Sequence, residues 1–99
     1  MKMTFVVYYE RVDAQVMTML KTVGIDYYTR WENVKGKGHG TEPHIGEGGF
    51  GRMNCALMIA FEDEAPLHAL IKAITAYNDS THRTDERVRL FQVPLDRIV

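Results

Sequence analysis

Glycines concentrate in one segment of this chain, and the segment has the residue types that bind anions. Seven of the eight glycines fall between Gly36 and Gly51, in the run GKGHGTEPHIGEGGFG. Glycine permits positive φ and exposes backbone N–H groups, so such a chain can wrap around a phosphate or another anion. Lys35 and Lys37 add positive charge at the start of the run. We therefore expect a long loop that binds a ligand or a partner rather than a helix or strand.

The same segment contains side chains that bind transition metals. His39 and His44 lie five residues apart within it. Glu42 and Glu47 are nearby, and Cys55 follows the segment. Imidazole, carboxylate and thiolate ligands together suit zinc, copper or nickel, although this spacing matches no established metal motif. A divalent transition-metal site at His39 and His44, used in metal sensing or tolerance, is the alternative function that the sequence leaves open.

No pattern in the sequence indicates catalysis. There is no nucleophile–base pair at an informative spacing and no G-x-S-x-G motif. The acidic residues that do occur cannot be told apart from surface carboxylates. We therefore expect a protein that is not an enzyme.

The overall composition is typical of one small globular domain. The 99 residues suffice for a single domain over residues 1–99, with 45% hydrophobic and 25% charged residues. A net charge of −1 argues against the basic surface that nucleic-acid binding requires. No apolar run is long enough to span a bilayer, and the first residues do not resemble a signal peptide. The single cysteine, Cys55, fits a reducing compartment, so we expect a cytoplasmic protein.

Apolar periodicity predicts four strands and two helices around the glycine-rich segment. Residues 3–9, 25–34, 53–61 and 87–93 have the β-branched and aromatic composition of strands. Residues 12–23 repeat at helical spacing, with Asp13 placed to cap the start and Gly24 to end the helix. Residues 65–77 form the second predicted helix, with Pro66 in its first turn. The order β-α-β-β-α-β predicts an α+β ferredoxin-like fold, in which a four-stranded antiparallel sheet carries both helices on one face.

The predicted strands are apolar on both of their faces. The run MTFVVYY of residues 3–9 shows this most clearly. Two helices on one face cannot cover the other face, so we expect further copies of the chain to bury it in a homo-oligomer. Trp31 is expected to pack across the sheet or a subunit interface, with a stacking platform for a base as the alternative.

Two stretches of the chain resemble the PII (nitrogen regulatory P-II-like) signalling protein family. The first comprises Gly24-Ile25, Thr29 and the run VKGKGH of residues 34–39, which is similar to the family's second strand and its V-K-G-x-G entry into the long T-loop. The second is LFQVPLDRIV, residues 90–99, which is similar to the family's last strand and the segment after it. The order of elements and the place of the loop between the second and third strands also agree. Alignment with the family requires one extra residue in the second strand, which we expect to form a bulge.

The resemblance implies a function. PII proteins are homotrimers that bind adenine nucleotides in the clefts between subunits and regulate a target protein through the T-loop. By that resemblance, the small-molecule effector of this chain is ATP, ADP or AMP. The tip of the loop, residues 41–52, would contact a target protein, possible targets including a membrane transporter.

The resemblance also implies which residues bind the ligand. At and before the loop base they are Thr29, Lys35, Gly36, Lys37, Gly38 and His39. The chain departs from the family because residues 78–87 lack the second glycine-rich phosphate loop, and the arginine pair after the last strand is missing. Arg83, Arg87 and Arg97 are the candidates to replace the missing positive groups. The alternative for each of them is an arginine exposed to solvent.

Overall fold

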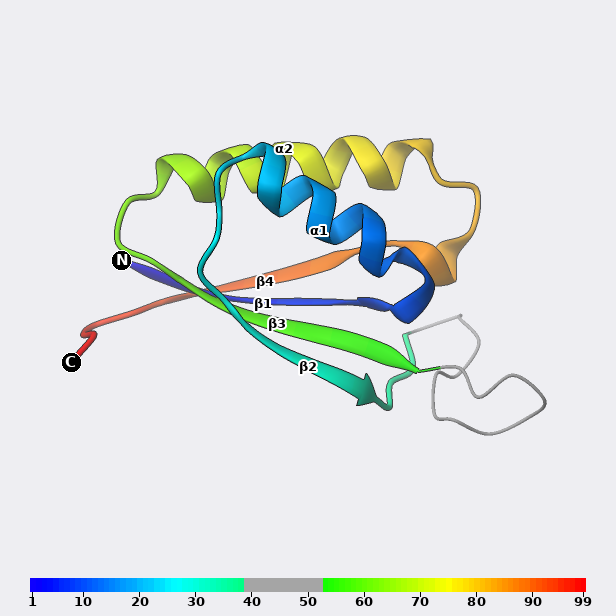
Figure 1. Cartoon of the computed structure of the whole chain (residues 1–99), viewed down its shortest axis with the longest axis horizontal. Helices are drawn as coiled ribbons and strands as arrows, with labels where there is room; N and C mark the ends of the chain where they lie inside the picture. The colour runs from blue at the N-terminus through cyan, green and yellow to red at the C-terminus, as the bar shows by residue number, and fades with distance from the viewer. Residues whose placement is uncertain (39–52) are drawn as a thin grey trace.

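The structure is a computed structural model that describes residues 1–38 and 53–99. Its strands are β1 (Lys2–Tyr9), β2 (Thr29–Val34), β3 (Asn54–Phe61) and β4 (Arg89–Pro94). Its helices are α1 (Asp13–Thr22) and α2 (Ala65–Ser80), and two short 3-10 turns are η1 (Glu10–Val12) and η2 (Thr84–Glu86). The predicted β-α-β-β-α-β order is therefore confirmed (Figure 1).

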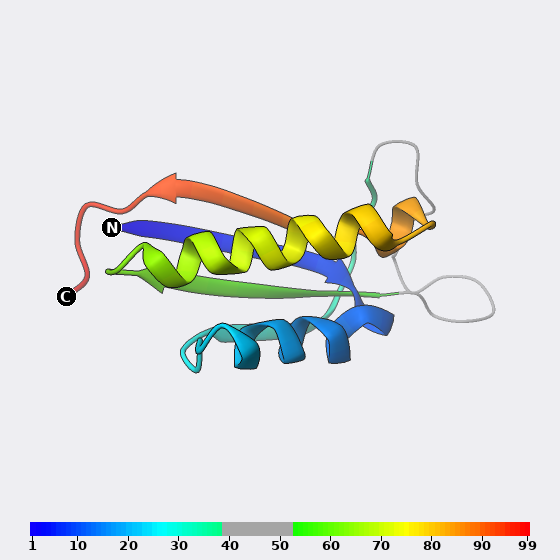
Figure 2. The ribbon, with the colours of Figure 1, turned by 90° about the horizontal axis from the view of Figure 1, so that it is seen from above.

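The four strands form one antiparallel sheet in the order β2-β3-β1-β4. Both helices lie side by side on the same face of it, and the opposite face carries no helix (Figures 1 and 2). The register places Val6 of β1 beside Leu57 of β3 on one side and Leu90 of β4 on the other, under the helices. The core between the sheet and the helices is a single cluster that includes Val6, Tyr8, Val16, Leu20, Cys55, Leu57, Ile59, Phe61, Leu67, Leu70, Ile74 and Val88.

The face of the sheet without helices is apolar, as the sequence predicted. We call it the open face and define it by four exposed side chains, Phe5, Trp31, Phe91 and Val93. Phe5 pairs with Phe91 across β1 and β4, so the aromatic rings of neighbouring strands share this face. Trp31 is 46% exposed and Phe91 51% exposed. Within one chain, burial of these strands on both sides is therefore incomplete.

The end of α1 explains why β2 begins later than predicted. Gly24 adopts φ of 80°, and its N–H donates to Lys21 O at 3.2 Å. The N–H of Ile25 donates to Leu20 O at 2.9 Å, which completes the hydrogen bonds of a Schellman motif. Gly24 thus ends the helix as predicted. The backbone of Ile25 closes that motif and its side chain is buried in the core. The strand therefore begins at Thr29 rather than at residue 25.

Asp13 does not cap α1, and this prediction was wrong. The residue before the helix is Val12, and no side-chain capping hydrogen bond is present. The Asp13 carboxylate instead accepts from Tyr8 Oη at 2.7 Å and from Arg30 Nη2 and Nε at 2.8 and 3.2 Å. Arg30 therefore joins the start of α1 to the edge strand β2, and its Nη2 lies 3.8 Å from Sγ of the buried Cys55 in β3. Burial and the hydrogen bond to Asp13 raise the pKa of Tyr8, which keeps its phenol protonated as a donor.

An irregularity in β2 confirms the expected extra residue. Trp31 pairs with Ala56 of β3, but Val34 pairs with Asn54, so three steps on β2 match two steps on β3. Asn33 lies between them with φ of 58°, the left-handed region that asparagine tolerates better than most residues. The bulge lies directly before the loop base.

The boundaries of the last helix and strand also differ from the prediction. The helix α2 continues to Ser80 rather than ending at residue 77, and β4 begins at Arg89 rather than at residue 87. Asn78 explains both shifts because its side chain donates to Val88 O and accepts from Val88 N, each at 2.8 Å. This side chain takes the place of a strand partner for Val88, which is 1% exposed. No helix in residues 1–38 and 53–99 is long and apolar enough to cross a membrane.

Candidate functional site

A cleft of about 480 Å³ opens at the end of the sheet where β1 ends and where β3 and β4 begin. Figure 1 shows this end of the sheet opposite the two chain termini. The cleft lies on the side of the open face, because the strand residues Val7, Tyr9, Asn54, Arg89 and Phe91 alternate onto that side. Its other lining residues are Tyr8, Gly36, Lys37, Gly38, Thr84, Asp85 and Arg87.

The loop base forms one wall of the cleft and is held against β3. Asn54 is only 9% exposed, and Gly36 approaches it so closely that a Cβ at Gly36 would overlap the side-chain amide. Glycine therefore leaves room here for the Asn54 side chain and is not needed for an unusual φ. The backbone of Met53 is fixed as well, because its carbonyl accepts from Glu10 N at 3.0 Å. The two strands that flank the glycine-rich segment thus present a defined rim to the cleft.

The cleft combines positive charge with an aromatic surface. Lys37, Arg87 and Arg89 are exposed side chains that line it. The guanidinium carbon of Arg89 lies 5.9 Å from the centroid of the Phe91 ring, within range of a cation–π contact. Arginine and lysine bind phosphate oxygens, and an exposed phenyl ring offers a stacking or apolar contact to a flat ring. The described lining therefore suits a ligand that has both an anionic and an aromatic part.

The structure brings together four of the residues predicted to bind a ligand. Gly36, Lys37, Gly38 and Arg87 all line the cleft, although 50 residues of sequence separate Lys37 from Arg87. Their role in binding stays a prediction, but their proximity is a property of the fold.

The other predicted ligand-binding residues have different positions. Lys35 is exposed next to the cleft but does not line it. Thr29 is at the start of β2, paired with Met58, and Arg97 follows β4 near the chain terminus, so neither lines the cleft of its own chain. Arg83 is turned to Asp85, whose Oδ1 lies 3.2 Å from its Nε. The proposed roles of these four residues stay predictions.

Sequence reasoning missed Asn54, Asp85, Arg89 and Phe91. Arg89 and Phe91 carry a signal in retrospect, because they lie two apart in a strand and so share one face. The ferredoxin-like order also places the start of β4 beside the end of β1, where the loop base lies. Asp85 and Asn54 had no such signal, since their positions depend on η2 and on the bulge in β2.

The predicted metal site lies outside the described residues. His39 and His44 belong to residues 39–52, which the structure does not describe. Within residues 1–38 and 53–99, no group of three or more histidine, cysteine, aspartate or glutamate side chains could hold a metal ion. Cys55 is 3% exposed, and burial together with the Asp13 carboxylate raises the pKa of its thiol. It packs in the core as a small buried hydrophobic residue.

Comparison with solved structures identifies the fold. The chain is similar to CPII, a nitrogen regulatory PII-like protein from Thiomonas intermedia K12, in a structure bound to ADP, AMP and bicarbonate, with 18% sequence identity and a TM-score of 0.69. Two further CPII structures, one with ADP and bicarbonate and one with ADP, AMP and acetate, match at 16% and 15% identity, each with a TM-score of 0.67. All three matches cover 97% of this chain and 88% of CPII.

At the level of sequence, no protein-family model and no curated protein matches the chain. The similarity is therefore one of structure, and it extends over nearly the whole of both chains. It bears out the resemblance drawn from the VKGKGH run and the C-terminal strand. The chain has the fold of the PII-like nitrogen regulatory proteins.

Proposed function

We propose that this chain is a PII-like regulatory protein that binds an adenine nucleotide in the cleft beside the loop base. The observation that carries the proposal is the meeting of Gly36–Gly38, Arg87 and the Arg89–Phe91 pair in one cleft. The backbone and the cations suit the phosphates, and Phe91 suits the adenine ring. The similar CPII structures contain ADP, and two of them contain AMP as well, which supports an adenine nucleotide as the ligand.

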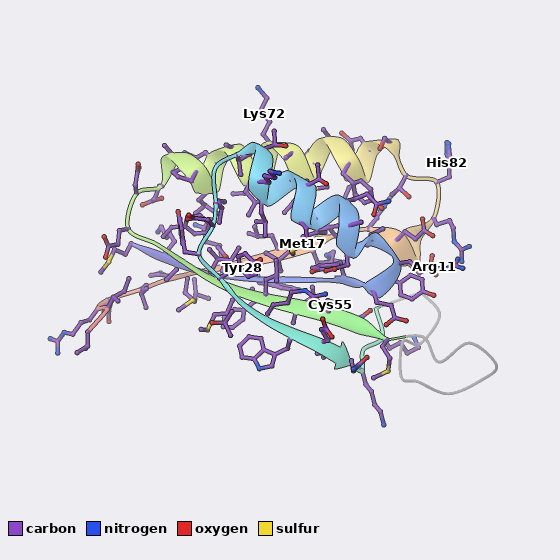
Figure 3. All side chains as sticks on the ribbon, viewed as in Figure 1. Arg11, Met17, Tyr28, Cys55, Lys72 and His82 are labelled. Atoms are coloured by element: carbon purple, nitrogen blue, oxygen red, sulfur yellow. The ribbon has the colours of Figure 1, made fainter. Side chains whose placement is uncertain are left out.

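Titration calorimetry with AMP, ADP and ATP on the purified full chain tests this proposal. We expect heat of binding with at least one of the three, and a Lys37→Gln variant should bind it about tenfold more weakly, as for loss of one charge-assisted hydrogen bond. Lys72→Gln is the matched control because it removes the same charge on the outer side of α2, away from the sheet (Figure 3). The absence of heat with all three nucleotides at millimolar concentration would refute nucleotide binding. Equal affinity of the Lys37→Gln and Lys72→Gln variants would place the ligand elsewhere.

We also propose that three copies assemble through the open face. The open face exposes apolar surface at Phe5, Trp31, Phe91 and Val93. Both helices lie on the other face of the sheet (Figure 1). Burial of such a surface is favourable by about 25 cal/mol per Å² of apolar area, and closed symmetric assemblies bury it on every copy. Light scattering on the parent is expected to give the mass of a trimer, and Phe5→Glu is expected to give a lower mass. A parent that is monomeric at all concentrations would contradict the assembly.

The regulatory output of the proposed function uses the glycine-rich segment. In this proposal residues 41–52 contact a target protein, and a nucleotide at the loop base alters that contact. The proposal is for a regulatory rather than a catalytic protein, acting in the cytoplasm as the sequence led us to expect. Its target is a protein of unknown identity, with a membrane transporter among the candidates that the PII resemblance implies.

A further inference from the structure

The cleft contains a fixed negative charge among its positive ones. In the described part of the lining, Lys37, Arg87 and Arg89 are the cations and Asp85 is the one carboxylate. The carboxylate comes from the acidic turn η2 (Thr84–Glu86), in residues 78–87, which lack glycine. A site built only to attract phosphates would not place a carboxylate in its wall, because a carboxylate repels them.

Asp85 is held in place rather than free to turn away. Its side chain is 9% exposed, whereas that of its partner Arg83 is 54% exposed. Arg83 donates to both carboxylate oxygens, from Nε to Oδ1 and from Nη2 to Oδ2, each at 3.2 Å. The segment that follows is fixed by the paired hydrogen bonds between Asn78 and Val88. A ligand therefore meets this charge at a defined position in the wall.

The cations that line the cleft with Asp85 are exposed, so water and salt screen their attraction for a ligand more strongly than they screen the effect of the nearly buried carboxylate. Arg83 offsets part of the Asp85 charge, but Asp85 lines the cleft and Arg83 does not. The repulsion between the carboxylate and a nucleotide grows with the number of negative charges on the phosphates. Each added phosphate thus increases the affinity for this cleft less than it would for a site lined only by cations.

We propose that Asp85 is a specificity-determining residue of the cleft, which favours adenine nucleotides with one or two phosphates over the triphosphate. This inference rests on the proposed function, because it assumes that an adenine nucleotide binds there. It goes further by assigning the preference among nucleotides to one side chain and to its charge.

The test is calorimetry with AMP, ADP and ATP, without added divalent cations, on the parent and three variants. Asp85→Asn removes the charge and keeps the shape, and Asp85→Glu keeps the charge. Glu86→Gln is the matched control, because Glu86 is the next residue, also lies near Arg83 at 3.7 Å, and does not line the cleft. Circular dichroism of each variant checks that the fold is unchanged.

The parent is expected to bind AMP and ADP more tightly than ATP. Asp85→Asn is expected to increase the affinity for AMP about threefold, for ADP about fivefold and for ATP about tenfold, because the repulsion that it removes scales with the charge of the ligand. Asp85→Glu should retain the parental order of affinities, and Glu86→Gln should shift all three by less than about twofold because its charge is more distant and more screened.

Several results would overturn the inference. Equal changes for all three nucleotides in Asp85→Asn would mean that charge repulsion is not the cause, and uniform weakening would show that Asp85 accepts a hydrogen bond from the ligand instead. The same graded change in Glu86→Gln would show a general effect of net charge. Binding of nucleotides with no preference against ATP would refute this inference and leave the proposed function standing, whereas no nucleotide binding at all would refute both.

Discussion

Arg30→Met is expected to lower the free energy of unfolding by about 2–3 kcal/mol, because it removes one partner of a largely buried ion pair. The side chains of Arg30 and Asp13 are 25% and 27% exposed, and two hydrogen bonds join them. Without Arg30, the Asp13 carboxylate keeps the hydrogen bond from Tyr8, and its charge lies near the thiol of the buried Cys55. Urea denaturation at one fixed protein concentration measures the change.

The control for Arg30→Met is the same substitution at an arginine whose own side chain is more exposed. Arg83 also contacts an aspartate through two nitrogen atoms, but its side chain is 54% exposed. Arg83→Met should therefore move the urea midpoint less than Arg30→Met does. A double-mutant cycle of Arg30→Met with Asp13→Asn isolates the coupling between the two side chains. Equal midpoints for the Arg30 and Arg83 variants would show that the join between α1 and β2 adds no more to stability than the contact between Arg83 and Asp85 does.

Asn78→Ala is expected to cost about 2 kcal/mol of the free energy of unfolding, because it leaves two backbone groups of a buried residue without their partner. Both the N–H and the C=O of Val88 are bonded to the Asn78 side chain at 2.8 Å. The segment held this way includes η2 and Arg87, so the variant should also weaken nucleotide binding in the cleft. Urea denaturation and the calorimetric titration measure the two effects on the same sample.

Asp79→Ala serves as the comparison for Asn78→Ala. Asp79 is the next residue of α2 and is exposed, so its removal is expected to change stability by less than about 0.5 kcal/mol. Asn78→Asp keeps the acceptor for Val88 N–H but places a carboxylate against Val88 C=O, and it should be as unstable as the alanine variant. If Asn78→Ala unfolds at the same urea concentration as Asp79→Ala, the paired hydrogen bonds do not fix the start of β4.

The fold could be predicted from the sequence because local signals and the global arrangement agreed. The β-branched and aromatic composition of residues 3–9, the helical spacing around Leu20 and the glycine at position 24 each indicated the element that the structure has there. Even the bulge in β2 was visible as a residue too many in the alignment with PII proteins.

The parts that could not be predicted depend on contacts between distant residues. Asp13 is a good capping residue by local rules, but Arg30, 17 residues away, engages its carboxylate more strongly than the helix end does. Residues 78–87 read as one polar loop, because nothing nearby in the sequence shows that Asn78 will bond to Val88. The cleft was predicted in part for the same reason: the loop base was recognised by its motif, whereas Asp85 and Asn54 enter it only through tertiary structure.

Phe91 lies where the two proposed equilibria meet, the binding of a nucleotide and the association of chains. It belongs to the open face and also lines the cleft, and Arg89 contacts its ring. In the proposed assembly, a copy of the chain that covers the open face therefore contacts the same ring that the proposed nucleotide would contact. Thermodynamic linkage then requires that any effect of the nucleotide on association be matched by an equal effect of association on nucleotide affinity. If both proposals hold, one phenyl ring near the start of β4 makes the cleft and the assembly parts of a single cooperative system.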